Sequence, residues 1–302
     1  MATTRKPKLT PFAEYFSQSH QGYHLMGKEY RDLFVEAVED YFSRLKHHCY
    51  IAGQPGVGKT YTVEEVSKKF PNVYLLPLKG NMTVWAFTKV IAVTLYQLRN
   101  TKMKVAVYVD DMNHIFKANS NFLDLFKIAM DKASGDCIEY NVSLGAQYEA
   151  CEPIEKEAID YWREQDPTRV GFRIPFNGNV KFIFTMNTPL PGAQELAKHK
   201  VGTDPWIKLN NRSAIRSRVK YEDLVMTKEV HWGWMADVLW HAPKMCAGST
   251  DDQKFEMLMW MWDNWETVSE HSLRFIEEQM WDIMQQFPKR PQYLARWEKL
   301  KG

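Results

Sequence analysis

The chain has 302 residues, 45% of them hydrophobic, which is enough for one large domain or two smaller ones with proper cores. Its formal net charge of +2 argues against a molecule that binds nucleic acid through its overall charge, although a local basic patch stays compatible with it. The four cysteines lie far apart without a CxxC pair, so we expect neither a zinc ribbon nor a disulfide framework, but reduced and buried thiols.

The first 22 residues are polar and basic and contain two prolines, which predicts a flexible basic arm. Apolar residues at three- and four-residue spacing then predict a helix over about 28–46. No apolar segment resembles a signal sequence, and the longest candidate for a membrane span, 84–96, is interrupted by Lys89. We therefore expect no membrane insertion and a cytoplasmic location, which would be the host cytoplasm for a viral protein.

From residue 48 onward, short apolar runs alternate with segments of helical periodicity. Strands are predicted over 48–52, 72–78, 104–111 and 180–187, and helices over about 59–70, 84–98 and 120–133. Near-continuous apolar strands are what a parallel sheet covered on both faces requires. The pattern predicts an α/β fold over 23–227, built from crossover units.

Two regions break this alternation. Residues 141–172 carry seven acidic side chains against three basic ones, and we interpret them as an acidic insertion that is unsuited to lie on a phosphate backbone. From residue 228 helical periodicity takes over, which predicts a small helical domain over 228–302. Eight of the eleven tryptophans lie in this part, and their spacing favours a core or a subunit interface over stacking platforms for bases.

The stretch GQPGVGKT, residues 53–60, follows a predicted strand and matches the pattern G-x-x-x-x-G-K-[ST]. In such a loop the backbone N–H groups surround the phosphates of a nucleotide, the lysine neutralises their oxygens and the hydroxyl binds magnesium. The candidate nucleotide-binding residues are Gly53, Gln54, Pro55, Gly56, Val57, Gly58, Lys59, Thr60 and Tyr61. The sequence therefore predicts a site for ATP and Mg²⁺, against the alternative of a glycine-rich turn without a ligand.

A phosphate-binding loop also requires residues elsewhere that hold magnesium and prepare the attacking water. The strand VAVYVDD supplies Asp110 as a magnesium ligand and Asp111 to polarise the water. Asn187, at the end of KFIFTMN, fits a residue that orients this water, although an asparagine at this place is also a common start of a turn. Asp111 is one methylene shorter than the glutamate we would expect, which favours slower hydrolysis or a displaced water.

A positive charge that reaches the γ-phosphate from outside is the remaining requirement. The stretch NRSAIRSRV offers Arg212, Arg216 and Arg218 just before a predicted edge strand, VKYEDL. An arginine at this place stabilises charge on the transferring phosphoryl group, which is worth roughly 10³ to 10⁵ in rate in measured cases. The alternative is a solvated basic turn.

In this order, and with the predicted helical region behind them, these elements resemble an AAA+ ATPase over nearly the whole chain from about residue 24. The stretches DDMN and FIFTMNTP are most similar to the branch that contains the MoxR-type and dynein-related ATPases. The resemblance implies a P-loop NTPase core with a parallel sheet flanked by helices, followed by a small all-helical lid. It is compatible with a bacterial or viral accessory ATPase.

Carried over to this sequence, the resemblance implies a Walker A motif at 53–60, a Walker B pair at Asp110 and Asp111, and sensor 1 at Asn187. Arg218 is the first candidate for the arginine finger and Arg216 the second. In the lid, SLRFIEE resembles the start of a sensor 2 helix, which implies that Arg274 binds the nucleotide of its own subunit. The loop 78–85 corresponds to a place where rings of this family carry pore-facing residues.

An arginine finger acts on the nucleotide of a neighbouring subunit, so the resemblance implies a homo-oligomeric ring, with six subunits as the expected number. The expected activity is Mg-dependent ATP hydrolysis that remodels or translocates a macromolecular target, either protein or DNA. The alternative is an ATP-gated loader or switch that binds a protein partner or DNA, as a replication or recombination accessory with slow turnover. The spacing of about 76 residues between the acid pair and Asn187 exceeds what the minimal module needs, which leaves the target open.

Overall fold

The computed structural model describes residues 12–112, 121–131, 136–242 and 244–301. Its internal contacts divide the chain into two compact units. The sheet unit comprises Val38–Gly53 and Val63–Leu224, and the helical unit comprises Met1–Ala37, Gln54–Thr62 and Val225–Gly302, each as far as it is described.

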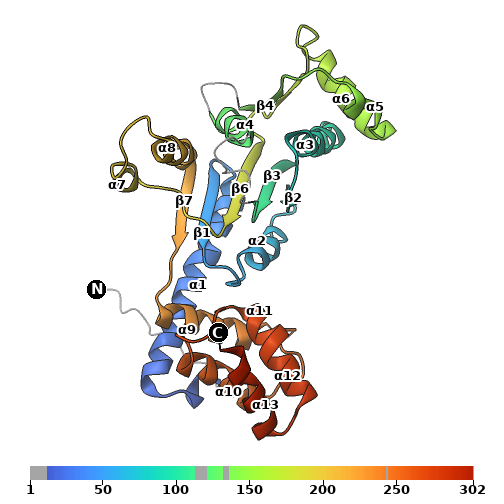
Figure 1. Cartoon of the computed structure of the whole chain (residues 1–302). Coiled ribbons are helices and arrows are strands. Elements are labelled where there is room, and N and C mark those ends of the chain that lie inside the picture. Colours follow the sequence, from blue (N-terminus) through green and yellow to red (C-terminus); the bar gives the residue numbers. More distant parts are fainter. Residues whose placement is uncertain (1–11, 113–120, 132–135, 243, 302) are drawn as a thin grey trace, which may run out of the picture. The chain divides into compact units, whose positions relative to one another are not determined.

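Five parallel strands form the centre of the sheet unit, in the order β2-β3-β6-β1-β7 (Figure 1). They are β1 (His48–Gly53), β2 (Val73–Lys79), β3 (Lys104–Asp110), β6 (Val180–Met186) and β7 (Val219–Leu224). Strands β1 and β6 are buried at every position, whereas the outer strands β2 and β7 are partly exposed. Inner strands of a parallel sheet are covered on both faces, so their sequences are continuously apolar. The predicted α/β fold with a parallel sheet is confirmed, and β7 lies at the edge as expected.

Helices pack against this sheet through aromatic side chains. The helices that lie wholly or partly in the sheet unit and outside the insertion are α1 (Gln18–Arg44), α2 (Lys59–Ser67), α3 (Val84–Leu98), α4 (Asn121–Ala129), α7 (Ala193–Leu196) and α8 (Asp204–Arg216). Phe126 of α4 lies edge-on to Phe87 of α3 and to Phe182 of β6, with ring centroids 5.3 and 5.4 Å apart. All three rings are buried, so α3, α4 and β6 share one core.

The acidic segment that we interpreted as an insertion folds into a small subdomain of its own elements. Residues 141–172 contain α5 (Ala146–Glu149) and α6 (Pro153–Glu164), and the antiparallel pair β4 (Cys137–Tyr140) and β5 (Phe172–Pro175) flanks them. Trp162 of α6 is buried and donates a hydrogen bond from Nε1 to the carbonyl of Ala92 in α3 at 2.9 Å. A Cβ on Gly171 would lie 1.6 Å from the carbonyl oxygen of Tyr140, so only glycine closes the neck of this segment.

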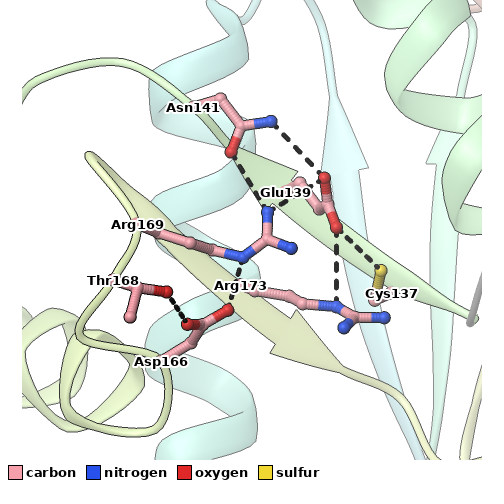
Figure 2. A network of polar contacts seen from close by, with 7 residues as sticks. All are labelled: Cys137, Glu139, Asn141, Asp166, Thr168, Arg169 and Arg173. Carbon is pink, nitrogen blue, oxygen red and sulfur yellow. Dashed lines mark hydrogen bonds and ion pairs between the residues drawn. The ribbon is translucent and has the colours of Figure 1, made fainter.

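A network of charged side chains spans the neck, as Figure 2 shows. Glu139 accepts ion pairs from Arg169 at 3.2 Å and from Arg173 at 3.5 Å. Arg169 also contacts Asp166 at 2.6 Å. A hydrogen bond from Thr168 and this contact lower the pKa of Asp166. The acidic residues of the neck are thus largely compensated by arginines of the same segment.

The helical unit has an aromatic core. Its elements are η1 (Phe12–Tyr15), the first part of α1, α9 (Lys228–His241), α10 (Asp251–Asp263), α11 (Leu273–Phe275), the π-helix η3 (Ile276–Trp281), α12 (Asp282–Gln286), α13 (Arg290–Trp297) and η4 (Glu298–Leu300). Trp232 and Trp297 are fully buried and donate their indole N–H groups to the carbonyls of Leu258 and Met280. These two tryptophans are core residues, which confirms the more conservative of the two interpretations.

The N-terminal part of α1 corrects two sequence predictions. We expected a flexible arm up to residue 22 and a helix from about Lys28, but α1 begins at Gln18, and Phe12 and Phe16 are buried. The helix continues through Gly27, where the backbone of α9 lies very close. A Cβ on Gly27 would lie 2.0 Å from the backbone N of Trp234, so only glycine fits there. Glycine costs helix stability, roughly 1 kcal/mol, but permits this close approach. Residues 1–11 lie outside the described part of the chain.

The cysteine prediction is confirmed, because all four cysteines are free and buried. Burial raises the pKa of both Cys49 and Cys246 to about 12, so these two thiols stay protonated and unreactive near neutral pH. Within the described residues, no helix is at once long enough and apolar enough to cross a membrane.

Candidate active site

Strand register brings several of the predicted site residues to one end of the sheet. Ala52 of β1 is paired with Met186 of β6, and Asp110 of β3 is paired with Thr185 of β6. The glycine that starts the loop, the acid pair and the asparagine therefore follow three adjacent strands at the same carboxyl end. This end of an open parallel sheet is where α/β proteins bind their ligands.

Asp110 is held by a side chain that sequence reasoning did not select. Its Oδ1 accepts a hydrogen bond from Thr185 Oγ1 at 2.5 Å, and Thr185 Oγ1 lies 2.9 Å from the hydroxyl of Tyr108. Its Oδ2 faces Lys79 Nζ at 4.0 Å, and Lys79 also contacts Glu64 at 2.8 Å. The side chain of Asp110 is 14% exposed. Solvent therefore reaches this carboxylate, one oxygen of which is held by the hydrogen bond from Thr185.

Asp111 and Asn187 lie together, as their proposed roles require. Asn187 Nδ2 donates to Asp111 Oδ1 at 3.1 Å, and both residues are exposed. Asp111 has a φ of 49°, in the left-handed region that aspartate tolerates better than most residues. Its backbone N–H donates to the carbonyl of Thr185 at 3.0 Å, which ties this turn to β6.

Both candidate finger arginines are engaged within the sheet unit. Arg218 Nη1 donates to the carbonyl of Ala214 at 2.7 Å, and Nη2 forms an ion pair with Asp131 at 3.4 Å. Arg216 Nη1 donates to the carbonyl of Leu190 at 2.6 Å, and its guanidinium lies 3.9 Å from the ring centroid of Tyr221. Arg218 has the looser of the two settings, because its carboxylate partner is 35% exposed.

The third arginine of this stretch, Arg212, donates to the carbonyl of Pro189 at 2.6 Å. Together with the bond from Arg216 to Leu190, it fixes the segment that follows Asn187 onto α8. At least this arginine therefore has a structural role.

The glycine loop belongs to the helical unit from Gln54 onward. Gly56 and Gly58 have φ values of 73° and 78°, which side-chain-bearing residues rarely adopt. Lys59 is buried, and its Nζ donates to the carbonyl of Gln54 at 2.7 Å, across the loop itself. A phosphate oxygen would be a stronger acceptor for this ammonium than a neutral carbonyl.

The loop residues differ in how far they face solvent. Val57 is buried, which anchors the loop, and Pro55 and Tyr61 are exposed. Thr60 is half-buried at the start of α2. Tyr61, at the start of α2, is 59% exposed.

Ser272 is a loop contact that the sequence prediction missed. A Cβ on Gly56 would lie 2.1 Å from Ser272 Cβ, and the N–H of Leu273 donates to the carbonyl of Gly56 at 3.3 Å. Ser272 also caps α11 by accepting the N–H of Phe275 at 3.0 Å. Serine is a favoured residue at the start of a helix, but no local pattern indicates the contact of Ser272 with a loop over 200 residues earlier.

Arg274 follows Ser272 by two residues and is 75% exposed, with an ion-pair contact to Glu278 at 3.9 Å. Exposed contacts at this distance are weak, so the guanidinium is available to a stronger anion. Downstream lies the π-helix Ile276–Trp281, a rare form often found near functional sites.

A buried histidine lies in the electrostatic range of the loop lysine. Burial lowers the pKa of His231 to about 4, and the charges of His271 and Lys59 add to this effect. His231 packs edge-on against Trp265, whose carbonyl accepts a hydrogen bond from His271 Nε2 at 2.6 Å. His231 is therefore neutral at physiological pH, chiefly because it is buried.

The predicted metal ligands lie in different units, Thr60 in the helical unit and Asp110 in the sheet unit. Their hydroxyl and carboxylate oxygens are the hard donors that Mg²⁺ prefers. Within the described part of the chain, no group of three or more His, Cys, Asp or Glu side chains is arranged to hold a metal. Each of the two residues taken by itself has a donor that fits Mg²⁺, which typically takes one or two protein ligands and completes its shell with phosphates and water.

In the loop 78–85, which the resemblance matches to a pore-facing segment, Met82 and Trp85 are half-buried and Lys79 is exposed. Met82 and Trp85 pack against the core of the sheet unit, and the Trp85 ring lies 5.1 Å from that of Tyr140. Lys79 is paired with Glu64.

Comparison of the chain with protein-family models and with curated proteins found no match in either case.

Proposed function

We propose that this protein is a Mg-dependent ATPase of the AAA+ class. The observation that carries this proposal is the strand register: a loop of sequence GQPGVGKT starts at the carboxyl end of β1, and Asp110, Asp111 and Asn187 follow β3 and β6 at that same end. A phosphate-binding loop, a metal-binding carboxylate and a water-orienting pair are the parts that phosphoryl transfer to water requires. The helical unit would then correspond to the lid.

In this proposal each residue has a defined task. Lys59 exchanges the carbonyl of Gln54 for the β- and γ-phosphate oxygens, and the loop N–H groups add further donors. Thr60 and Asp110 would hold Mg²⁺, which would neutralise charge on the phosphates. Asp111 accepts a proton from the attacking water.

Asn187 orients that water from the neighbouring strand, and its hydrogen bond to Asp111 keeps the two polar groups together. Arg274, whose guanidinium makes only a weak exposed contact, binds the nucleotide of the same subunit.

The active form would be a ring, with six subunits as the expected number, in which Arg218 or Arg216 acts on the nucleotide of the next subunit. Arg218 is the better candidate because its ion pair with Asp131 is partly exposed and can be exchanged for a phosphate. Hydrolysis would change the position of the lid and pass force to a bound macromolecule, protein or DNA. The buried, free cysteines agree with a reducing compartment such as the cytoplasm.

A second candidate function is an ATP-gated loader or switch with slow turnover. It is favoured by the contact between Asp111 and Asn187, since each occupies the other with a hydrogen bond at 3.1 Å. A short aspartate that is already bound in this way reaches the attacking water less readily than a glutamate would. In a switch, ATP binding itself would drive assembly on a protein partner or DNA.

The proposal is tested with Lys59→Ala in the full-length protein. We expect nucleotide binding to weaken strongly and ATP turnover to fall at least about 100-fold, since Lys59 supplies the main positive charge of the loop. Lys289→Ala, which changes an exposed lysine of the helical unit, is the matched control and should behave as wild type. Unchanged turnover in Lys59→Ala would contradict the ATPase.

Asp111→Asn separates the two candidate functions. In a motor it should abolish the turnover that the oligomer shows, because the base for the attacking water is lost. In a switch it would leave a slow basal rate unaltered while ATP still triggers assembly, which light scattering can follow.

A further inference from the structure

Two buried hydroxyl groups form a chain that ends on Asp110. Tyr108 is fully buried and Thr185 is 1% exposed, so solvent does not compete for either hydroxyl. Tyr108 Oη lies 2.9 Å from Thr185 Oγ1, and Thr185 Oγ1 lies 2.5 Å from Asp110 Oδ1. Residues 108 and 110 are two apart on β3, and Thr185 is the register neighbour of Asp110 on β6.

The direction of this chain follows from the chemistry of its end. A carboxylate only accepts hydrogen bonds, so the single hydroxyl proton of Thr185 must go to Asp110. Thr185 Oγ1 can then only accept from its other neighbour, which makes Tyr108 the donor. Both hydroxyls are therefore oriented toward the carboxylate, and a hydrogen bond to a charged acceptor is of the stronger kind.

The chain fixes one oxygen of Asp110, and a lysine lies near the other. Oδ1 is bound from within the sheet, while Oδ2 faces the ammonium of Lys79 at 4.0 Å. Lys79 has a closer partner in Glu64, at 2.8 Å, so it can withdraw from Asp110 without losing its ion pair. Asp110 thus presents an oriented oxygen, and the cation that now faces it is loosely held.

Thr185 also acts on the second acid, because its carbonyl accepts the backbone N–H of Asp111 at 3.0 Å. One residue of β6 therefore contacts both members of the acid pair, through its side chain and through its main chain. Substitutions of the side chain alter the first contact and leave the second in place.

We propose that Thr185, oriented by Tyr108, is the positioning residue that sets the Asp110 carboxylate for the divalent cation of the nucleotide complex. The inference rests on the proposed nucleotide site and adds to it two residues that the motif does not contain. Residues that hydrogen-bond a metal-ligating carboxylate fix its orientation, and their loss typically costs about 10- to 100-fold in metal affinity or activity.

The test compares Thr185→Val, Thr185→Ser and Tyr108→Phe in the full-length protein. Binding of a fluorescent ATP analogue is measured in EDTA and across a MgCl₂ titration. Valine keeps the shape of threonine and removes the hydroxyl, so we expect the MgCl₂ concentration for half-maximal enhancement of binding to rise about 10- to 100-fold. Affinity in EDTA should stay that of wild type. Serine restores the hydroxyl and should return the titration to within about threefold of wild type.

Tyr108→Phe guards against a folding defect in the valine variant. It removes only the second hydroxyl of the chain, and we expect a shift of the MgCl₂ titration in the same direction but smaller, with a melting temperature close to that of wild type. A purely structural hydroxyl would instead lower the melting temperature and the affinity in EDTA and leave the MgCl₂ midpoint in place.

The outcomes separate this inference from the proposed function. Wild-type protein that binds no nucleotide, with or without MgCl₂, would overturn the proposed function and this inference with it. Nucleotide binding that MgCl₂ strengthens equally in wild type, Thr185→Val and Tyr108→Phe would overturn only the role of Thr185.

Discussion

Two aspartates, one in each unit, show how the surroundings of a carboxylate decide its use. Asp237 of α9 is fully buried among Arg31 at 3.1 Å, His241 at 3.2 Å and His24 at 3.6 Å. Its burial raises the pKa, but the contact with His24 and the charges of Arg31 and His241 outweigh this, and the pKa lies below its ordinary value.

Asp110, by contrast, is reached by solvent, and a neutral hydroxyl and a distant lysine are among its partners. The charge of Asp237 is compensated by Arg31 of the same unit, so this residue joins α1 to α9. Asp110 is reached by solvent, and we propose that it binds a divalent cation. A motif search selects Asp110 and passes over Asp237, yet the more heavily paired residue is the structural one.

Asp110→Asn tests most directly whether Asp110 serves turnover and not stability. The amide still accepts the bond from Thr185 but carries no charge for Mg²⁺. The barrier to ATP hydrolysis should therefore rise by several kcal/mol, which slows the reaction at least about 100-fold. The free energy of unfolding should change by no more than about 1 kcal/mol. A turnover assay and urea unfolding of the same sample measure both. Loss of stability without loss of turnover would reverse the roles we assign to the two aspartates.

Asp237→Asn should show the opposite pattern. Removing one partner of a buried ionic cluster leaves Arg31 without its counterion, and we expect a loss of about 3–5 kcal/mol in the free energy of unfolding. At temperatures where the variant stays folded, affinity for a nucleotide should match that of wild type. Asp263→Asn, an exposed change in the same unit, is the control and should alter stability by less than about 0.5 kcal/mol. Equal stability of the two variants would refute a structural role for Asp237.

The buried His231 extends the comparison to a group whose charged form is disfavoured by burial and by its neighbours His271 and Lys59. Its folded-state pKa of about 4 lies below the ordinary value of 6.5, so the unfolded chain takes up its proton first as pH falls. Its contribution to stability is complete above about pH 6.5 and is lost as the pH falls to about 4, a change of roughly 3 kcal/mol.

Urea unfolding of His231→Gln and wild type between pH 7 and pH 4 measures this term, since other titrating groups contribute to both curves. The difference between the two should shrink toward acid pH. His47→Gln removes an exposed histidine and serves as the control, with a curve parallel to that of wild type. A His231→Gln curve that is also parallel to wild type would show that this histidine titrates normally.

Much of the sheet could be predicted because the inner strands follow a simple physical rule. Burial on both faces makes β1 and β6 apolar throughout, and the four main strands were expected within a few residues of their observed bounds. The start of α1 was not predicted, because Gly27 is unfavourable in a helix unless another backbone needs its space. The short strands β4 and β5, four residues each, give too weak a periodic signal.

The residues of the candidate site also fall into those that local sequence predicts and those that depend on distant contacts. Residues whose chemistry follows from local sequence, such as Lys59 and Asp110, could be named from the motif. Thr185 could have been suspected, since it is a polar residue within a buried strand, but its partner depends on which strand lies beside β6. Ser272 depends on a contact across more than 200 residues, which no local pattern encodes.

The neck of the acidic segment bears on how such a segment could be gained or lost in evolution. The chain leaves at Tyr140 and returns at Gly171, where the backbones touch, so a short turn could replace everything between them without moving β4 or β5. Packing opposes such a deletion. Ala158, Ile159 and Trp162 of α6 are buried, and Trp162 bonds to α3 through Ala92. A lineage that lost the segment would have to make the outer surface of α3 polar at the same time, which ties the history of the acidic segment to that of α3.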